Sequence, residues 1–124
     1  MHDIRADLNK NRIYISIGKI ENESEMQSIV DKVKSECPKL KTGFTCLTDL
    51  RYYEYQDEIF EKYIKEAQEA LLAQGMSKVV RVHRKVGMLG HLQFETVSLD
   101  LGYRAKNVTS MEEAEKILDG EANE

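Results

Sequence analysis

Residues that break regular secondary structure or form covalent cross-links are scarce in this 124-residue chain. One proline and seven glycines argue against a loop-rich structure. The only cysteines, Cys37 and Cys46, are nine positions apart, which matches neither a redox pair nor a zinc-ligand spacing. We therefore expect both to be reduced thiols, with Cys46 acting as a small core residue.

Long apolar runs and a large excess of one charge are also missing. No apolar segment approaches the roughly 20 residues that span a bilayer, and the polar residues 1–11 do not resemble a signal peptide. The 18 basic and 22 acidic residues are interspersed and leave a net charge of −4. We expect a cytoplasmic protein that binds neither membranes nor nucleic acid, since such a surface does not attract anionic polymers.

The composition that remains is that of one globular domain. Hydrophobic residues make up 41% of the chain and charged residues 32%, which excludes a disordered chain. The length is ordinary for a domain with one core. We therefore predict a single domain over residues 1–120, followed by a frayed tail at residues 121–124.

Patterns of apolar residues predict five strands. Every second residue is apolar in segments 4–8 and 13–17, which predicts a β-hairpin with one buried face. Segment 43–50 is rich in apolar and β-branched residues and suits a strand that is buried on both faces. Shorter strands are expected at residues 78–82 and, at an edge of the sheet, at residues 103–108.

Capping patterns and helical spacing predict four helices. Capping boxes begin at Ser24 and Ser110, and Gly75 is suited to the left-handed residue that ends a helix. Segment 88–101 is ambiguous, because its leucines fit both helical spacing and alternation. We interpret it as a helix because of its length and because Gly102 follows it. The helices are expected at residues 24–38, 57–74, 88–101 and 110–120.

The resulting order is β-β-α-β-α-β-α-β-α, which predicts an α/β fold. Strands that alternate with helices pair in parallel through right-handed crossovers, whereas the opening hairpin is antiparallel. We therefore expect a mixed, mostly parallel sheet. This order, the segment Leu47-Thr48-Asp49-Leu50 before Asp57, and the C-terminal strand with its capped helix resemble the STAS domains of bacterial anti-sigma-factor antagonists.

The resemblance implies a regulatory protein-interaction domain, but this chain departs from the family at its phosphorylation motif. In the switching members, an Asp-Ser-Ser/Thr-Gly motif opens the helix and its second hydroxyl residue is phosphorylated. The matching residues here are Asp57-Glu58-Ile59-Phe60, and segment 51–74 contains no serine or threonine. We therefore expect no phospho-switch. Glu58 stands where a helix N-terminus favours an acidic side chain, either for that reason alone or as a fixed negative charge.

A tyrosine-rich segment is the first candidate site. Three tyrosines in four positions follow a predicted strand, and tyrosine combines contact area with a polar tip, which suits interfaces. The alternative is that one or two of these rings cover the core. The predicted partner-binding residues are Arg51, Tyr52, Tyr53, Tyr55, Asp57 and Glu58.

A basic segment is the second candidate site. It follows the predicted strand 78–82, and ligands of open α/β sheets bind beyond the carboxyl ends of strands. A helix N-terminus beyond it would favour an anion, although the glycines match no nucleotide motif. The alternative is a solvated basic loop. The predicted ligand-binding residues are Arg81, His83, Arg84, Lys85, Gly87 and Gly90.

No pattern in the chain indicates catalysis. The three histidines are scattered, and no serine or cysteine has a base placed by its sequence context. We expect no metal, no cofactor and no enzymatic activity. The predicted function is binding of a protein partner or self-association. The alternative is a sensor or carrier of a small anionic or apolar ligand, held between segments 51–56 and 83–90.

Overall fold

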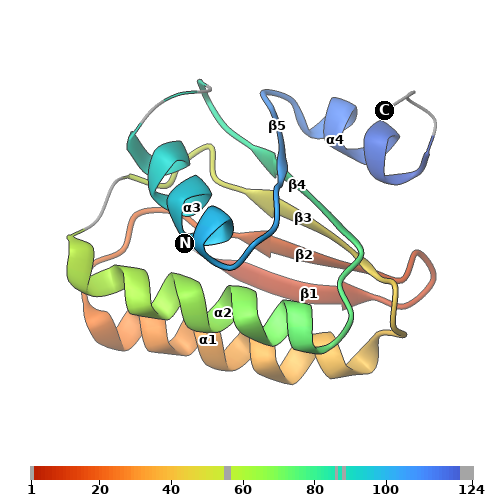
Figure 1. Ribbon diagram of the computed structural model, residues 1–124, viewed down its shortest axis with the longest axis horizontal. Helices are drawn as coiled ribbons and strands as arrows, with labels where there is room; N and C mark the ends of the chain where they lie inside the picture. The colour runs from red at the N-terminus through yellow and green to blue at the C-terminus, as the bar shows by residue number, and fades with distance from the viewer. Residues whose placement is uncertain (1, 55–56, 86, 88, 121–124) are drawn as a thin grey trace.

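The computed structural model describes residues 2–54, 57–85, 87 and 89–120, and these form an α/β structure around a five-stranded sheet (Figure 1). The strands lie in chain order, with β1 antiparallel to β2 and all other neighbours parallel. The predicted mixed, mostly parallel sheet with an N-terminal hairpin is confirmed. The strands are β1 (Asp3–Asp7), β2 (Arg12–Ser16), β3 (Thr45–Asp49), β4 (Lys78–Val82) and β5 (Lys106–Val108).

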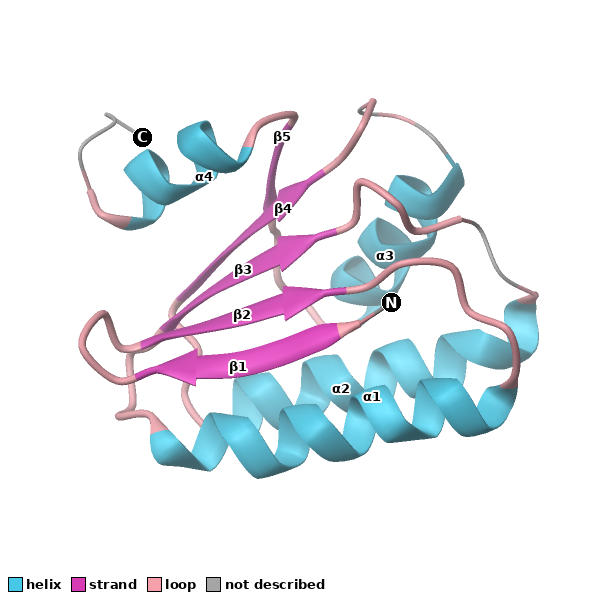
Figure 2. Cartoon of the chain, turned by 180° about the vertical axis from the view of Figure 1, so that it is seen from behind, coloured by secondary structure: helices cyan, strands magenta, loops and turns pink. Residues whose placement is uncertain are grey.

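Four α-helices cover the two faces of the sheet. Helices α1 and α2 lie side by side along one face, and α3 lies on the same side near the N-terminal end of α2 (Figures 1 and 2). Helix α4 packs on the other face, over β3, β4 and β5. The helices are α1 (Glu23–Glu36), α2 (Glu61–Ala73), α3 (Leu89–Asp100) and α4 (Met111–Leu118), with short 3-10 turns η1 (Cys37–Lys39) and η2 (Glu58–Phe60).

The central strands β3 and β4 are buried on both faces. Successive side chains of a strand point to opposite faces, so Cys46 and Val79 join the core beneath α1, α2 and α3. Leu47 and Val80 belong to the smaller core beneath α4. This two-sided burial agrees with the continuous apolar run that predicted β3.

A buried arginine attaches α4 to the sheet. Arg12, at the start of β2, is 3% exposed and forms ion pairs with Glu115 of α4 and with Asp119, which caps that helix, the second at 2.8 Å. Its Nε also donates a hydrogen bond to Thr45 Oγ1 on β3. A buried charge needs such partners because its loss of hydration is costly. Arg12 therefore anchors the last helix to the second and third strands.

Local details differ from the prediction at three places. The first helix is capped by Asn22, whose side chain accepts from the Glu25 amide at 2.9 Å, so the capping box at Ser24 is wrong. Leu8 lies in the hairpin turn and is 67% exposed, because β1 ends at Asp7. The last strand begins only at Lys106 rather than at residue 103. The Ser110 cap is confirmed by its bond to the Glu113 amide.

Two glycines with left-handed backbones, Gly43 just before β3 and Gly75 just after α2, test how the turns at this end of the sheet pack together. Gly43 and Gly75 have φ of +93° and +99°, and the Gly43 amide donates to the Gly75 carbonyl at 2.7 Å. A Cβ on Gly75 would lie 2.7 Å from Thr42 Cγ2, whereas one on Gly43 meets nothing within 4 Å.

We expect Gly43→Ala to cost about 1 kcal/mol of unfolding free energy, which is the strain of a left-handed residue. Gly75→Ala adds the clash with Thr42 and should cost at least about 2 kcal/mol. Urea unfolding of both variants measures the difference. Equal losses would contradict the packing described at Thr42.

Candidate functional site

The segments that follow β3 and β4 meet at the end of the sheet where these strands terminate. The carboxyl ends of β2, β3 and β4 all lie at this end, beside α3 (Figure 2). Tyr53, after β3, packs against Gly90, at the start of α3, where an added Cβ would lie 3.0 Å from Tyr53 Cδ2. The tyrosine-rich and basic segments are therefore neighbours in space.

Tyr53 belongs to the core rather than to a partner-binding surface. It is 5% exposed, and its ring stands edge-on to Phe94 with centroids 5.1 Å apart. Its hydroxyl donates to Gln93 Oε1 at 2.6 Å. The prediction that Tyr53 contacts a partner is thus wrong, because the ring is used to attach its loop to α3. This placement agrees with the alternative interpretation of the segment, in which one or two of the tyrosine rings cover the core.

The other residues of the tyrosine-rich segment have separate environments. Tyr52 is 64% exposed, with the Arg51 guanidinium 5.6 Å from its ring centroid. Arg51 also holds Asp49 through two hydrogen bonds of 2.9 Å. Burial raises the pKa of Asp49, but the bonds from Arg51 outweigh it and keep that pKa below its ordinary value. Tyr55 lies outside the described residues.

The start of the second helix follows this segment. Asp57 caps η2, with its Oδ1 3.4 Å from the Ile59 amide. Glu58 is exposed, and so is Ile59, at 49%. These residues place one acidic pair and one apolar side chain on the surface at the start of the second helix.

The basic segment divides into buried and exposed residues. Arg84, Lys85 and Gly87 are exposed. Arg81 is only 2% exposed, because it points from β4 into the core beneath α2 and α3. The expected site formed by Arg81 with Arg84 and Lys85 is therefore wrong: strand alternation puts Arg81 inside the protein. Gly90 is buried against Tyr53.

Two histidines stack at the end of β4. His83, which is buried, and His91 on α3 have ring centroids 4.3 Å apart. His83 Nε2 is 2.7 Å from Asn107 Oδ1, and the Gly87 amide donates to His91 Nδ1 at 2.8 Å. Since this bond needs an unprotonated Nδ1, it favours neutral His91.

One carboxylate and one guanidinium face this histidine pair. Glu95 Oε1 is 3.8 Å from His91 Nε2 and 3.7 Å from Arg81 Nη1. Burial is the main reason that the pKa values of His83 and His91 lie below the ordinary value, and the nearby positive charge of Arg81 adds to it. Both shifts favour the neutral rings, and the ring nitrogens His83 Nε2 and His91 Nδ1 are already engaged with Asn107 and Gly87.

Helix α3 carries large apolar side chains on both its inner and its outer side. Its inner side contributes Phe94 and Val97 to the core. Its outer side carries Leu89, Leu92 and Leu99, which are 65%, 47% and 47% exposed. The helix predicted for residues 88–101 is therefore confirmed over Leu89–Asp100, although the leucines on which that interpretation rested face outward.

This outward leucine row, Leu89, Leu92 and Leu99, was missed as a candidate site. Its helical spacing was visible in the sequence, but such spacing normally marks the face that packs on the core. An exposed apolar row on a helix that is already packed on its other side is typical of an interaction surface.

The described residues contain neither a metal-binding cluster nor a membrane helix. No three His, Cys, Asp or Glu side chains within the described ranges are arranged to hold a metal ion. None of the helices seen in this part of the chain has the length and apolar character to cross a bilayer.

The different burial of neighbouring tyrosines leads to opposite expectations for their alanine variants. Tyr53→Ala should lower the unfolding free energy by about 3–5 kcal/mol, because it empties a core position between Gly90 and Phe94. Tyr52→Ala should change it by less than about 0.5 kcal/mol. Urea unfolding checks both, and a similar loss in the two variants would contradict the placement of Tyr53.

The histidine pair predicts a loss of stability in mild acid. In the unfolded chain each histidine has its ordinary pKa near 6.5, whereas in the folded protein the pKa of each is lower. As the pH falls through about 6.5, the unfolded state therefore takes up protons first, and the unfolding free energy decreases.

Urea unfolding at pH 7.5 and 5.5 measures this loss. His91→Gln keeps an acceptor for the Gly87 amide but removes one titrating ring, so its loss between the two pH values should be smaller than that of the wild type. An equal loss would show that the stacked pair does not cause the pH dependence.

Comparisons with known proteins assign no family to this chain. No protein-family model matches it, and no curated protein matches it. The function is therefore argued from the arrangement of its residues.

Proposed function

We propose that this chain is a non-enzymatic, STAS-like protein-interaction domain, and that a second copy of the chain is the partner. The contact surface consists of the leucine row on α3, widened by Tyr52 and Ile59. The element order and the strand-loop-helix around Asp57 support the STAS-like interpretation. The observation that carries the proposal is that α3 exposes large apolar side chains while its other side is already in the core.

The spacing of the leucine row suits self-association. In an antiparallel pair of α3 helices, Leu89 would face Leu99 of the other copy, and Leu92 would face Thr96. Such an isologous contact uses the same patch twice and closes as a dimer. A stable interface buries more than about 1,000 Å² in total, so α3 needs Tyr52 and Ile59 as additional contact area.

The charges around α3 favour the same antiparallel arrangement. Arg84 and Lys85 are exposed before its N-terminal end, and Asp100 is exposed at its C-terminal end. In an antiparallel pair, the basic segment of each copy approaches the Asp100 end of the other. Opposite charges at the rim of an apolar contact favour correct orientation more than they add affinity.

Binding by this surface would not depend on phosphorylation. The start of the second helix reads Asp57-Glu58-Ile59-Phe60 and has no hydroxyl group to accept a phosphate. Glu58 supplies one constant negative charge there. The association would therefore be governed by concentration, apolar contact and fixed charge rather than by a kinase.

Sedimentation equilibrium tests the proposal on the full chain. The wild type is expected to be a dimer with a dissociation constant in the micromolar range, about −8 kcal/mol. Leu92→Glu buries a charge in the middle of the contact and should weaken dimerisation by at least about a hundredfold.

Leu8→Glu is the matched control. Leu8 is as exposed as Leu89 but lies in the hairpin turn, at the opposite end of the strands from α3 (Figure 1). This variant should dimerise as the wild type does. A wild-type chain that remains monomeric up to about 0.5 mM, or equal effects of the two glutamates, would contradict the proposal.

A further inference from the structure

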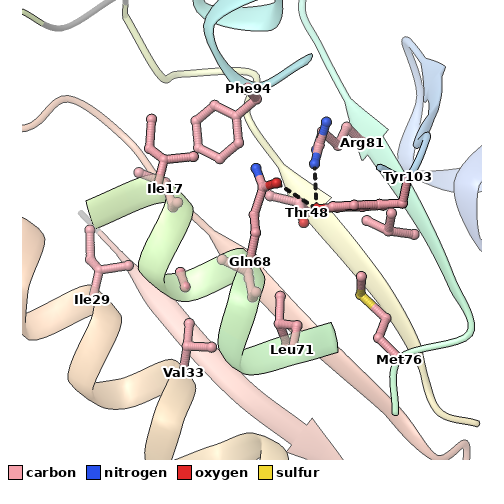
Figure 3. A pocket seen from close by; sticks show the side chains of 14 residues that line it. Ile17, Ile29, Val33, Thr48, Gln68, Leu71, Met76, Arg81, Phe94 and Tyr103 are labelled. Atoms are coloured by element: carbon pink, nitrogen blue, oxygen red, sulfur yellow. Dashed lines mark hydrogen bonds between the residues drawn. The ribbon is translucent and has the colours of Figure 1, made fainter. Parts of the chain in front are cut away.

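A cavity lies between the sheet and the helices α1, α2 and α3. It has a volume of about 30 Å³, enough for about two water-sized groups. Ten of the residues that line it are apolar, and the polar ones are Thr48, Gln68, Arg81 and Tyr103 (Figure 3). The cavity is independent of the leucine row on α3.

Hydrogen bonds among the polar groups orient them. Arg81 Nη2 donates to the oxygens of Ser98 and Tyr103, the second at 3.1 Å. The Tyr103 hydroxyl in turn donates to Gln68 Oε1 at 2.7 Å, whereas the Ser98 hydroxyl has two acceptors, Gln68 Oε1 at 3.0 Å and the Phe94 carbonyl at 3.1 Å. Because Tyr103 accepts from the guanidinium, it donates to the amide oxygen, and this orients Gln68.

Two buried donors remain without an acceptor as a consequence. Gln68 Nε2 and Arg81 Nη1 have no hydrogen-bond partner among the described residues. The side chain of Arg81 is 2% exposed, and Gln68 is 4% exposed. Glu95 Oε1, at 3.7 Å from Arg81 Nη1, is too distant for a hydrogen bond. A native core seldom leaves such donors unpaired.

The missing acceptor is best supplied by an anion. Both unpaired groups are N–H donors, and one of them belongs to a guanidinium that keeps its charge in proteins. A positive charge that has lost its water is stabilised strongly by a negative group that accepts its hydrogen bond. The apolar residues around the rest of the cavity favour an anion with a hydrocarbon part over a fully hydrated inorganic ion.

A surface hollow lies next to the inner cavity. The hollow has a volume of about 90 Å³ and shares Met76, Val79 and Tyr103 with the inner cavity. Lys78 and Arg104 line it as well, and basic groups at an entrance attract anions. Met76 is half-buried between the two spaces, and a thioether side chain repacks easily.

We propose that the cavity binds a short-chain carboxylate of two to four carbons. Its carboxylate accepts hydrogen bonds from Arg81 Nη1 and Gln68 Nε2, and its alkyl group points past Met76 toward the surface hollow. The bound carboxylate thereby provides an acceptor for both unpaired donors of the core. The site is separate from the proposed dimer contact, so either proposal can fail without the other.

NMR titration of the full-length, ¹⁵N-labelled chain with sodium propionate tests this site. We expect saturable shifts of the Gln68 side-chain amide, with smaller or no shifts for equal concentrations of sodium chloride or propionamide. Saturating propionate should also raise Tm by about 3 °C through its preference for the folded state. Chloride shifts that match those of propionate, or an unperturbed Gln68 amide, would overturn the proposal and indicate that water alone fills the cavity.

Gln68→Glu is the decisive variant, because it builds a carboxylate into the network in place of the amide. It should weaken propionate binding by at least about tenfold, or 1.4 kcal/mol. Gln74→Glu is the matched control, since it makes the same charge change at an exposed position after α2. If Gln68→Glu fails to fold, Arg81→Lys tests the same contact. Unchanged propionate affinity in the folded variant would overturn the proposal.

Discussion

Burial of β3 and β4 on both faces is the constraint on which the other features depend. Each of these strands sends alternate side chains into two separate cores, one beneath α1, α2 and α3 and one beneath α4. A charged side chain on such a strand has no route to solvent within the strand. Arg81 therefore lies inside the larger core, where burial lowers its pKa. Hydroxyls from α3 and from the segment after it, rather than water, accept its hydrogen bonds.

Helix α3 joins most of the features that we associate with function. Its inner side carries Phe94 against Tyr53 and Ser98 against Arg81. His91 and Glu95 extend the same polar network to the edge of the sheet. Its outer side presents leucines to the surface. Exposed apolar rows of this kind are typical of interaction surfaces, and in the described part of the chain this row supports the proposed contact between copies.

The candidate residues could be found from sequence more readily than their roles. The tyrosine-rich and basic segments do lie side by side, because they follow adjacent parallel strands. Tyr52 and Tyr53 differ completely in exposure, however, and no local signal separates two neighbouring tyrosines of one loop. Arg81 was grouped with Arg84 by proximity in sequence, although they lie on either side of the strand end. The leucines of α3 were used only to predict a helix, because their spacing does not show which face of the helix is covered.

The sequence by itself determined the secondary structure and the sheet. Alternation, capping residues and left-handed glycines act within a few residues, so the order of strands and helices, and with it the mixed sheet, followed from local patterns. Only the tertiary structure decided which side chains are buried and which donors remain unpaired. Those properties depend on contacts between residues that are 35 to 107 positions apart, such as Tyr53 with Gln93, Gln68 with Tyr103 and Arg12 with Asp119. Such contacts leave no pattern in the local sequence, because each is made by the packing of whole elements.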